Sequence, residues 1–255
     1  MDFFEHEGLR LAFRSDGEAA APVVMLLHGF ASSMTVNWVD PGWVKTLTEA
    51  GYRTVAFDHR GHGASDKPHD AAAYTPQKMA GDAAALMAHL GIPRAALFGY
   101  SMGARAAAFA ALATPSLFPR LIFGGLGIGL VDGVGDWDPI AAALLAPSLT
   151  DVIDNRGRMF RAFADRTRSD RQALAACIRT SRTEPTRAEV GSITQPTLIG
   201  VGTEDDIAGS AEELAALMPR ATAFAIPGRD HMLAVGDRRF KAEVLRFLGD
   251  TAALA

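Results

Sequence analysis

The stretch Gly99-Tyr100-Ser101-Met102-Gly103-Ala104 decides how the rest of the sequence is interpreted. It follows a short apolar run at residues 95–98, which predicts a buried strand, and it precedes the alanine-rich segment 105–113, which predicts a helix. Gly-x-Ser-x-Gly spacing between a strand and a helix is typical of a nucleophile elbow, in which a tight turn exposes the serine hydroxyl. Ser101 is therefore the candidate nucleophile.

Predicted strands and helices alternate on both sides of this stretch. Residues 3–14 alternate between apolar and polar side chains, which predicts an antiparallel hairpin at a sheet edge. Residues 23–27 form a continuous apolar run, as a strand covered by helices on both faces requires. Further, mainly apolar strands are predicted at 53–57, 95–98, 120–124, 196–202 and 221–226. Helices are predicted at 41–50, 75–90, 105–113, 210–217 and 237–248. The alternation predicts an α/β fold with a mostly parallel, eight-stranded sheet.

The alternation is interrupted once, between Gly125 and Gln195. No buried strand run occurs there, while residues 139–145, 152–166 and 170–183 have helical periodicity. Helices inserted at the carboxyl edge of a parallel sheet are typical of a lid over a site. We therefore expect residues 1–124 and 196–255 to form a core domain, with residues 125–195 inserted after the sixth strand as a helical cap.

The composition narrows the class of protein. The 255 residues contain 49% hydrophobic residues, and α/β proteins of this length are often a single domain. The net charge of −4 gives no electrostatic basis for binding nucleic acid or an anionic membrane. The one cysteine, Cys177, rules out an internal disulfide. Because the sequence contains neither a secretory signal nor a run of about twenty apolar residues, we expect a cytoplasmic enzyme; its oligomeric state stays open.

A serine nucleophile needs a general base, and the base needs an orienting partner. Asp205 follows the predicted strand 196–202, and His231 lies in the loop after the strand 221–226. The carboxyl ends of parallel strands meet at the same edge of a sheet, so we expect both side chains to lie beside Ser101.

Five motifs along the chain carry a family resemblance: His28-Gly29-Phe30, Asp58-x-Arg60-Gly61-x-Gly63-x-Ser65, Gly99-Tyr100-Ser101-Met102-Gly103, Gly202-Thr203-Glu204-Asp205 and Gly228-Arg229-Asp230-His231. Together they resemble the α/β-hydrolase family over nearly the whole chain, and the order Ser101, Asp205, His231 is that of the family. The chain is similar to compact, capped members such as small carboxylesterases. The resemblance implies that the backbone N–H groups of Phe30 and Met102 form an oxyanion hole.

The resemblance also implies hydrolysis of a small-molecule carboxylic ester through an acyl-enzyme. His231 takes the Ser101 proton, Asp205 orients the imidazole, and water then releases the acyl group. No metal or organic cofactor is required. Thioesterases, lactonases, carbon–carbon bond hydrolases and perhydrolases use the same triad, so these activities stay open, as do acyl transfer and a ligand-binding protein with this fold. Epoxide or halide chemistry in such relatives uses an aspartate nucleophile, and Ser101 disfavours it.

Other residues near the motifs have competing interpretations. Asp206 is adjacent to Asp205 and is the alternative acid of the triad. His59 and His62 have the spacing of metal ligands, but no further His or Cys cluster accompanies them, so a turn role is expected and no metal site is predicted.

The substrate pocket is expected to involve the apolar residues closest to the chemical groups. Phe30, Met102 and Met232 flank these groups in sequence and are predicted to line the pocket.

Two parts of the predicted cap have an unusual composition. The segment Gly124 to Gly135 contains six glycines, but Asp132 stands where a dinucleotide-binding fingerprint requires a third glycine, so we expect a mobile connection to the cap. Nine arginines lie between Arg156 and Arg187. We interpret them as solvated helix faces rather than as a site for anionic substrates.

Overall fold

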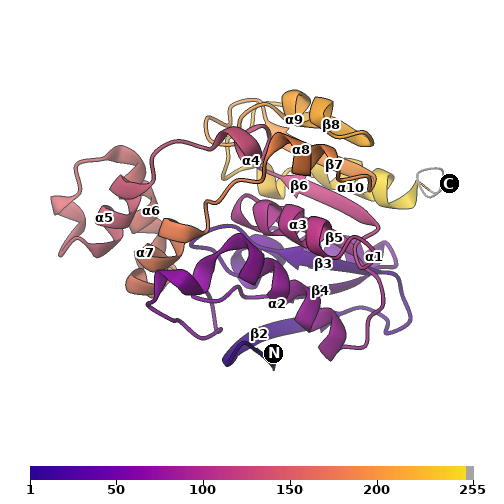
Figure 1. The fold of residues 1–255 in the computed structure, drawn as a ribbon, viewed down its shortest axis with the longest axis horizontal. Helices are drawn as coiled ribbons and strands as arrows, with labels where there is room; N and C mark the ends of the chain where they lie inside the picture. The colour runs from indigo at the N-terminus through magenta and orange to yellow at the C-terminus, as the bar shows by residue number, and fades with distance from the viewer. Residues whose placement is uncertain (251–255) are drawn as a thin grey trace.

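One eight-stranded sheet forms the centre of the computed structural model, which describes residues 1–250 (Figure 1). The strands are β1 (Asp2–His6), β2 (Leu9–Asp16), β3 (Val23–Leu27), β4 (Arg53–Phe57), β5 (Ala96–Tyr100), β6 (Arg120–Gly124), β7 (Thr197–Gly202) and β8 (Ala221–Ile226). Their spatial order is β1-β2-β4-β3-β5-β6-β7-β8. β1 pairs antiparallel with β2, and β2 with β4, whereas the other neighbours are parallel. The predicted fold, with a hairpin at the sheet edge, is confirmed.

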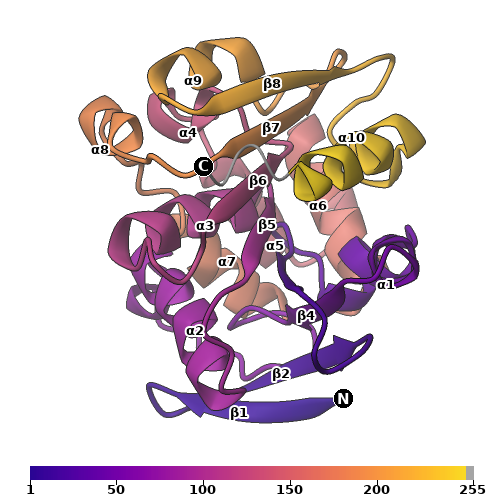
Figure 2. The same cartoon turned by 90° about the vertical axis from the view of Figure 1, so that its right-hand side faces the viewer.

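Helices cover both faces of this sheet. α1 (Trp43–Glu49) and α10 (Arg238–Gly249) lie on one face, and α2 (Pro76–His89), α3 (Met102–Ala113) and α9 (Ala211–Leu217) pack on the other (Figure 2). On the first face Trp38, Trp43, Phe98 and Phe240 pack edge to face. A strand buried on both faces has no solvent-facing side chains, which explains the continuous apolar runs in the sequence.

Local backbone signals set the helix boundaries. The Thr75 hydroxyl accepts a hydrogen bond from the Lys78 N–H and caps α2. α1 begins at Trp43 rather than at the predicted Pro41, because Gly42 has a φ of 82°, which a right-handed helix does not accommodate. Short elements that the sequence did not predict are the π-helix Thr35–Val39 and the 3₁₀ turns Ala71–Tyr74 and Ala234–Gly236.

A helical insertion lies between β6 and β7, to one side of the sheet (Figure 1). In the described residues it comprises α4 (Gly129–Asp132), α5 (Asp138–Leu145), the 3₁₀ turn Leu149–Asp151, α6 (Asn155–Arg166), α7 (Arg171–Thr180) and α8 (Arg187–Gly191). α5 packs against both α6 and α7, and the Thr180 hydroxyl of α7 donates to the Ala71 carbonyl of the core. The insertion therefore follows the sixth strand as predicted, while the exact domain limits stay a prediction; residues 251–255 of the predicted core lie outside the described residues.

The glycine-rich stretch after β6 is closely packed at its start. A Cβ atom on Gly127 would lie 2.4 Å from the Gly209 carbonyl oxygen. The N–H groups of Gly127 and Gly129 both donate to the Ala208 carbonyl, at 2.9 and 3.1 Å. These glycines allow two backbone segments to approach each other, a role that composition alone did not reveal.

A helix that crosses a bilayer needs about twenty predominantly apolar residues. No helix within residues 1–250 is long and apolar enough to do so.

Candidate active site

Ser101 lies on a sharp turn between β5 and α3. Its backbone has φ 53° and ψ −113°, a strained combination for a residue with a side chain. A Cβ atom on Gly99 would lie 2.2 Å from the Gly103 carbonyl oxygen, and one on Gly103 would lie 2.0 Å from the Leu27 carbonyl oxygen. Glycine is therefore required on both sides of Ser101, and α3 starts directly after the turn, earlier than the predicted residue 105.

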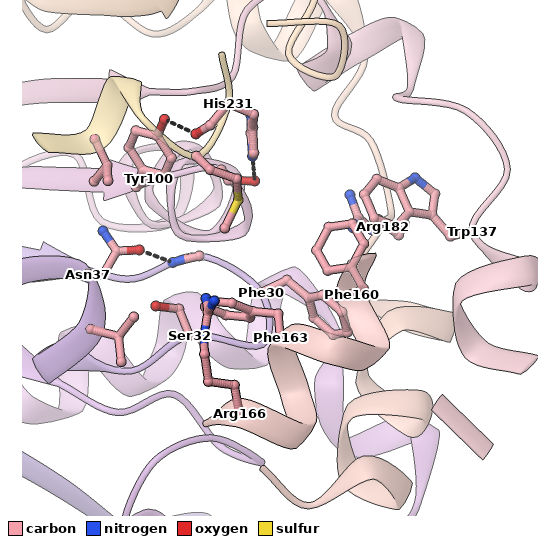
Figure 3. Close-up of a pocket in the computed structure, with 15 residues that line it drawn as sticks. Phe30, Ser32, Asn37, Tyr100, Trp137, Phe160, Phe163, Arg166, Arg182 and His231 are labelled. Carbon is pink, nitrogen blue, oxygen red and sulfur yellow. Dashed lines mark hydrogen bonds between the residues drawn. The ribbon is translucent and has the colours of Figure 1, made fainter. Parts of the chain in front are cut away.

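The structure brings Ser101, His231 and Asp205 together at the carboxyl edge of the sheet. His231 Nε2 lies 3.0 Å from Ser101 Oγ, a contact drawn as a dashed line from His231 in Figure 3. His231 Nδ1 lies 2.8 Å from Asp205 Oδ2. A carboxylate only accepts hydrogen bonds, so Nδ1 carries the proton of the neutral ring and Nε2 faces the serine hydroxyl as an acceptor. The geometry suits removal of the hydroxyl proton by His231.

Asp205 is held in its ionised form. Its side chain is fully buried, and Oδ1 accepts hydrogen bonds from the N–H groups of Ile207 and Ala208 at 2.9 and 3.0 Å. Burial raises the pKa of Asp205, but the hydrogen bond from His231 and the two backbone donors outweigh it and hold the pKa below its ordinary value. The neighbouring Asp206 is exposed. The structure therefore brings Asp205, and not the alternative Asp206, to His231.

The loop that carries His231 is fixed from two sides. The buried Tyr100 hydroxyl donates to the His231 carbonyl at 2.6 Å. Asp230 Oδ1 accepts from the N–H groups of Met232 and Leu233 at 3.0 and 2.8 Å. Burial raises the pKa of Tyr100 well above its ordinary value, so the hydroxyl keeps the proton that it donates. The sequence pattern did not indicate this role for Tyr100.

Two backbone N–H groups at the site have no acceptor. Among residues 1–250, neither the Phe30 N–H nor the Met102 N–H donates to a protein group. Met102 is the first residue of α3, where N–H groups have no partner within the helix. Asn37 Oδ1 accepts from the Gly29 N–H at 3.0 Å and holds the turn before Phe30. Sequence reasoning missed Asn37, because an isolated asparagine in a short π-helix gives no motif.

Neutral histidines also form hydrogen bonds with the turn around Phe30. His28 Nδ1 donates to the Gly29 carbonyl at 2.8 Å, and His28 Nε2 accepts from the His59 N–H at 3.0 Å. His62 Nε2 accepts from the Ala31 N–H at 3.2 Å. Burial lowers the pKa of His28 to about 4 and that of His62 to about 3, so both rings are neutral near pH 7. Within residues 1–250 no group of three or more His, Cys, Asp or Glu side chains is arranged to hold a metal ion.

A cavity with a volume of about 270 Å³ opens onto Ser101 between the sheet edge and the inserted helices (Figure 3). Its surface is mostly apolar, as is typical of small-molecule sites. The core contributes Gly29, Phe30, Ser32, Val36, Asn37, Tyr100, Ser101, His231, Met232 and Val235, and the insertion contributes Trp137, Phe160, Phe163, Arg166 and Arg182. The Phe160 ring lies 5.7 Å from both the Phe30 and Trp137 rings and joins the two sides.

The three side chains predicted to line the pocket have different positions. Phe30 and Met232 line the cavity, but Met102 does not. The Met102 side chain is buried, and its Sδ lies 3.8 Å from the Sγ of Cys177 on α7. The expectation for the Met102 side chain was therefore wrong, because the start of α3 directs it against a cap helix; only its backbone faces the site.

Comparisons with known proteins agree with this fold. A sequence profile described as the alpha/beta hydrolase fold matches residues 22–155. Epoxide hydrolase A of Mycobacterium tuberculosis is 36% identical over 125 residues, which are 44% of this chain and 38% of that protein. The sn-1-specific diacylglycerol lipase ABHD11 of Mus musculus is 34% identical over 108 residues, which are 42% of this chain and 33% of that protein. The matches thus span well under half the length of these curated relatives.

Solved structures match over almost the whole chain. A hydrolase from Pseudomonas aeruginosa PA01 is 27% identical, covers 98% of both chains and has a TM-score of 0.77. The enol-lactonase from Burkholderia xenovorans LB400 is 22% identical, covers 98% of this chain and 100% of its own, and also has a TM-score of 0.77. The second likeness shows a common fold alone.

Proposed function

Because the chain belongs to the α/β-hydrolase family, we propose that it hydrolyses carboxylic esters of small molecules through an acyl-enzyme intermediate on Ser101. The observation that carries the proposal is the hydrogen-bonded series from Ser101 Oγ to His231 Nε2 and from His231 Nδ1 to Asp205 Oδ2, at 3.0 and 2.8 Å. Ser101 and His231 line an apolar cavity large enough for a small ester, and Asp205 lies buried behind His231.

In the acylation step, Ser101 Oγ attacks the ester carbonyl while its proton moves to His231 Nε2. Asp205, whose pKa is held low, remains a carboxylate and stabilises the imidazolium through Nδ1. The protonated Nε2 then gives its proton to the leaving alcohol as the carbon–oxygen bond breaks. In the second step His231 takes a proton from water, the hydroxide attacks the acyl-enzyme, and Ser101 regains its proton as the acid leaves.

The negative charge on the tetrahedral intermediate needs donors that are already in place. The unpartnered N–H groups of Phe30 and Met102 suit this role, since they neither move nor break another hydrogen bond when the charge develops. Losing one such donor costs on the order of 3 kcal/mol of transition-state stabilisation in serine hydrolases. Asn37, which orients Gly29, acts on this role indirectly as a positioning residue.

The identity of the nucleophile favours esters over the epoxides named for several curated relatives. A serine oxygen that opens an epoxide becomes part of an ether, and the triad has no means of hydrolysing an ether. A serine oxygen that attacks an ester becomes part of a new ester, which water then cleaves by the same route. Ser101 thus completes a catalytic cycle with an acyl group.

Hydrolysis of a 4-nitrophenyl ester series from acetate to decanoate tests the proposal. Wild type and Ser101→Ala are assayed side by side, and labelling by a fluorophosphonate reports on the reactivity of Ser101 without requiring turnover. We expect a Ser101-dependent rate that is highest for short acyl chains, because the cavity is small. Labelling of Ser101 with no turnover on any ester would overturn the esterase proposal and favour a ligand-binding role.

A further inference from the structure

The arginines of the inserted helices do not share one environment. Arg161 donates to Asp165 at 2.9 Å, and Arg187 forms an exposed ion pair with Asp132 at 2.5 Å. The exposed pair of Arg187 is what the sequence interpretation of solvated helix faces predicts, whereas Arg161 is buried and also donates to the Ala143 and Ala146 carbonyls. Arg182, in the loop after α7, is different.

Arg182 lines the same cavity as Ser101. Its guanidinium carbon lies over the Trp137 ring, 3.1 Å from the ring centre, a contact that restricts the orientation of the group (Figure 3). Within residues 1–250 no carboxylate lies within ion-pair distance of Arg182 and no hydrogen bond from it is made; its Nε is buried without an acceptor. An N–H donor that is buried and unpaired, as Nε is, costs free energy.

The surrounding charges do not compensate this cation. Burial, followed by the neighbouring Arg105 and Arg156, lowers the pKa of Arg182 well below its ordinary value. Glu184 acts in the opposite direction, but it is exposed and makes no direct ion pair with Arg182. The charged form of Arg182 is therefore less stable in this position than it would be in water. An anion bound in the cavity would stabilise it.

The remaining polar groups of the cavity are also short of acceptors. Asn37 Nδ2 and Trp137 Nε1 are buried N–H donors without a partner among the described residues. Arg166 lines the cavity as a second, more exposed cation, with its guanidinium carbon 5.1 Å from the Phe163 ring centre. A ligand that carries a negative charge and several acceptor atoms suits these donors and cations better than an uncharged ligand.

We infer that the ester substrate carries a carboxylate group away from its reacting carbonyl, and that Arg182 binds this carboxylate. The inference rests on the proposed esterase function of Ser101. The planar guanidinium suits two parallel N–H···O bonds to one carboxylate, a geometry that a lysine does not reproduce. The group takes no part in bond breaking; it selects and orients the substrate.

Two matched pairs of esters test the inference. Mono-4-nitrophenyl adipate carries a carboxylate on the acyl side and 4-acetoxybenzoate carries one on the alcohol side; each is compared with its neutral primary amide. We expect wild type to prefer the carboxylate in at least one pair by roughly tenfold or more in kcat/KM, as charge-assisted hydrogen bonds imply. Arg182→Gln should abolish this preference, and Arg182→Lys should restore part of it.

Arg179→Gln provides the matched control, because Arg179 is an exposed arginine of α7 outside the cavity lining. It should keep the wild-type ratio. Thermal melting of each variant separates an effect on binding from a loss of folded protein. Equal kcat/KM for both members of both pairs, or a preference that persists in Arg182→Gln, would overturn the inference.

A binding experiment distinguishes failure of this inference from failure of the esterase proposal. Titration calorimetry of Ser101→Ala with 4-acetoxybenzoate and 4-acetoxybenzamide requires no turnover. Tighter binding of the carboxylate, lost in Ser101→Ala/Arg182→Gln, supports the anion site even if wild type hydrolyses none of the four esters. Turnover of all four esters with equal kcat/KM within both pairs, and equal binding of the two benzoyl compounds, leaves the esterase and removes the anion site.

Discussion

At the scale of single residues, the adjacent Asp205 and Asp206 lie in different surroundings. Asp205 Oδ2 contacts His231, and its Oδ1 is held by two backbone N–H groups, whereas Asp206 is exposed. The two backbone donors fix the carboxylate before any substrate binds. They therefore also fix which nitrogen of His231 carries the proton.

We predict that Asp205→Asn lowers kcat on 4-nitrophenyl acetate by roughly 10,000-fold, since an amide in this position favours the wrong tautomer of His231. Asp206→Asn should stay within about twofold of wild type, as expected of an exposed residue. Initial rates with active-site titration measure both. A severe loss in Asp206→Asn with an active Asp205→Asn would show that the acid has been assigned to the wrong residue.

The buried histidines predict a dependence of stability on pH. His28 and His62 bind a proton near pH 6.5 when unfolded, but only near pH 4 and pH 3 when folded. The unfolded state therefore binds more protons as pH falls from 6.5, and the free energy of unfolding decreases by roughly 1.4 kcal/mol per pH unit for each histidine. Their contribution is fully present above pH 6.5.

Burial also lowers the pKa of His59 well below its ordinary value, so three histidines contribute to the slope. We predict that His62→Gln removes about a third of this slope between pH 6.5 and pH 4.5. An amide side chain keeps a donor and an acceptor but does not titrate in this range. Urea unfolding at several pH values measures the slope, and His89→Gln, an exposed histidine at the end of α2, is the control. An unchanged slope in His62→Gln would mean that His62 is already protonated in the folded protein.

At the scale of helices and strands, mainly apolar runs were enough to predict the bounds of β3, β4 and β6, because burial on both faces favours apolar side chains. Features that depend on contacts between residues distant in sequence could not be predicted from apolar runs. The π-helix that holds Asn37 has no sequence signal, and the glycines near residue 127 acquire their role from the segment around residue 209. Arg182 was grouped with surface arginines because its missing partner is a tertiary property.

The contact between α3 and β3 gives a prediction at this scale. A Cβ atom on Gly103 would lie 2.0 Å from the Leu27 carbonyl oxygen, and backbone on both sides leaves little freedom to adjust. We predict that Gly103→Ala lowers the free energy of unfolding by about 3 kcal/mol or more and reduces esterase activity, because the helix start that presents Met102 N–H must shift. Urea denaturation and rates on 4-nitrophenyl acetate measure the two effects.

Gly249→Ala is the matched control for Gly103→Ala. Gly249 is the last residue of α10, and a Cβ atom there would meet nothing within 4 Å. We expect its stability to change by no more than about 0.5 kcal/mol. If Gly103→Ala is as stable as Gly249→Ala, α3 has more room above the sheet than this packing indicates.

At the scale of the whole molecule, the sheet brings together groups that are far apart in the chain. Ser101 and His231 are separated by 130 positions, yet both follow parallel strands and so meet at one edge. The inserted helices close the space above that edge and supply the only arginines that line the described cavity. We therefore expect the core to present the reacting groups and the insertion to determine which molecules reach them.

Ser101, which the core presents, limits the reactions that can be completed. This gives a final prediction. Ring opening of styrene oxide by Ser101 would form a carbon–oxygen ether bond to the enzyme, with no acyl carbon for water to attack. We therefore expect no enzyme-dependent diol, and intact-protein mass spectrometry should find either unmodified protein or a single adduct. The same sample should still hydrolyse 4-nitrophenyl acetate in proportion to its unmodified fraction. Multiple-turnover diol formation that Ser101→Ala abolishes would contradict the acyl-enzyme proposal, since it would require a covalent intermediate that an ether cannot provide.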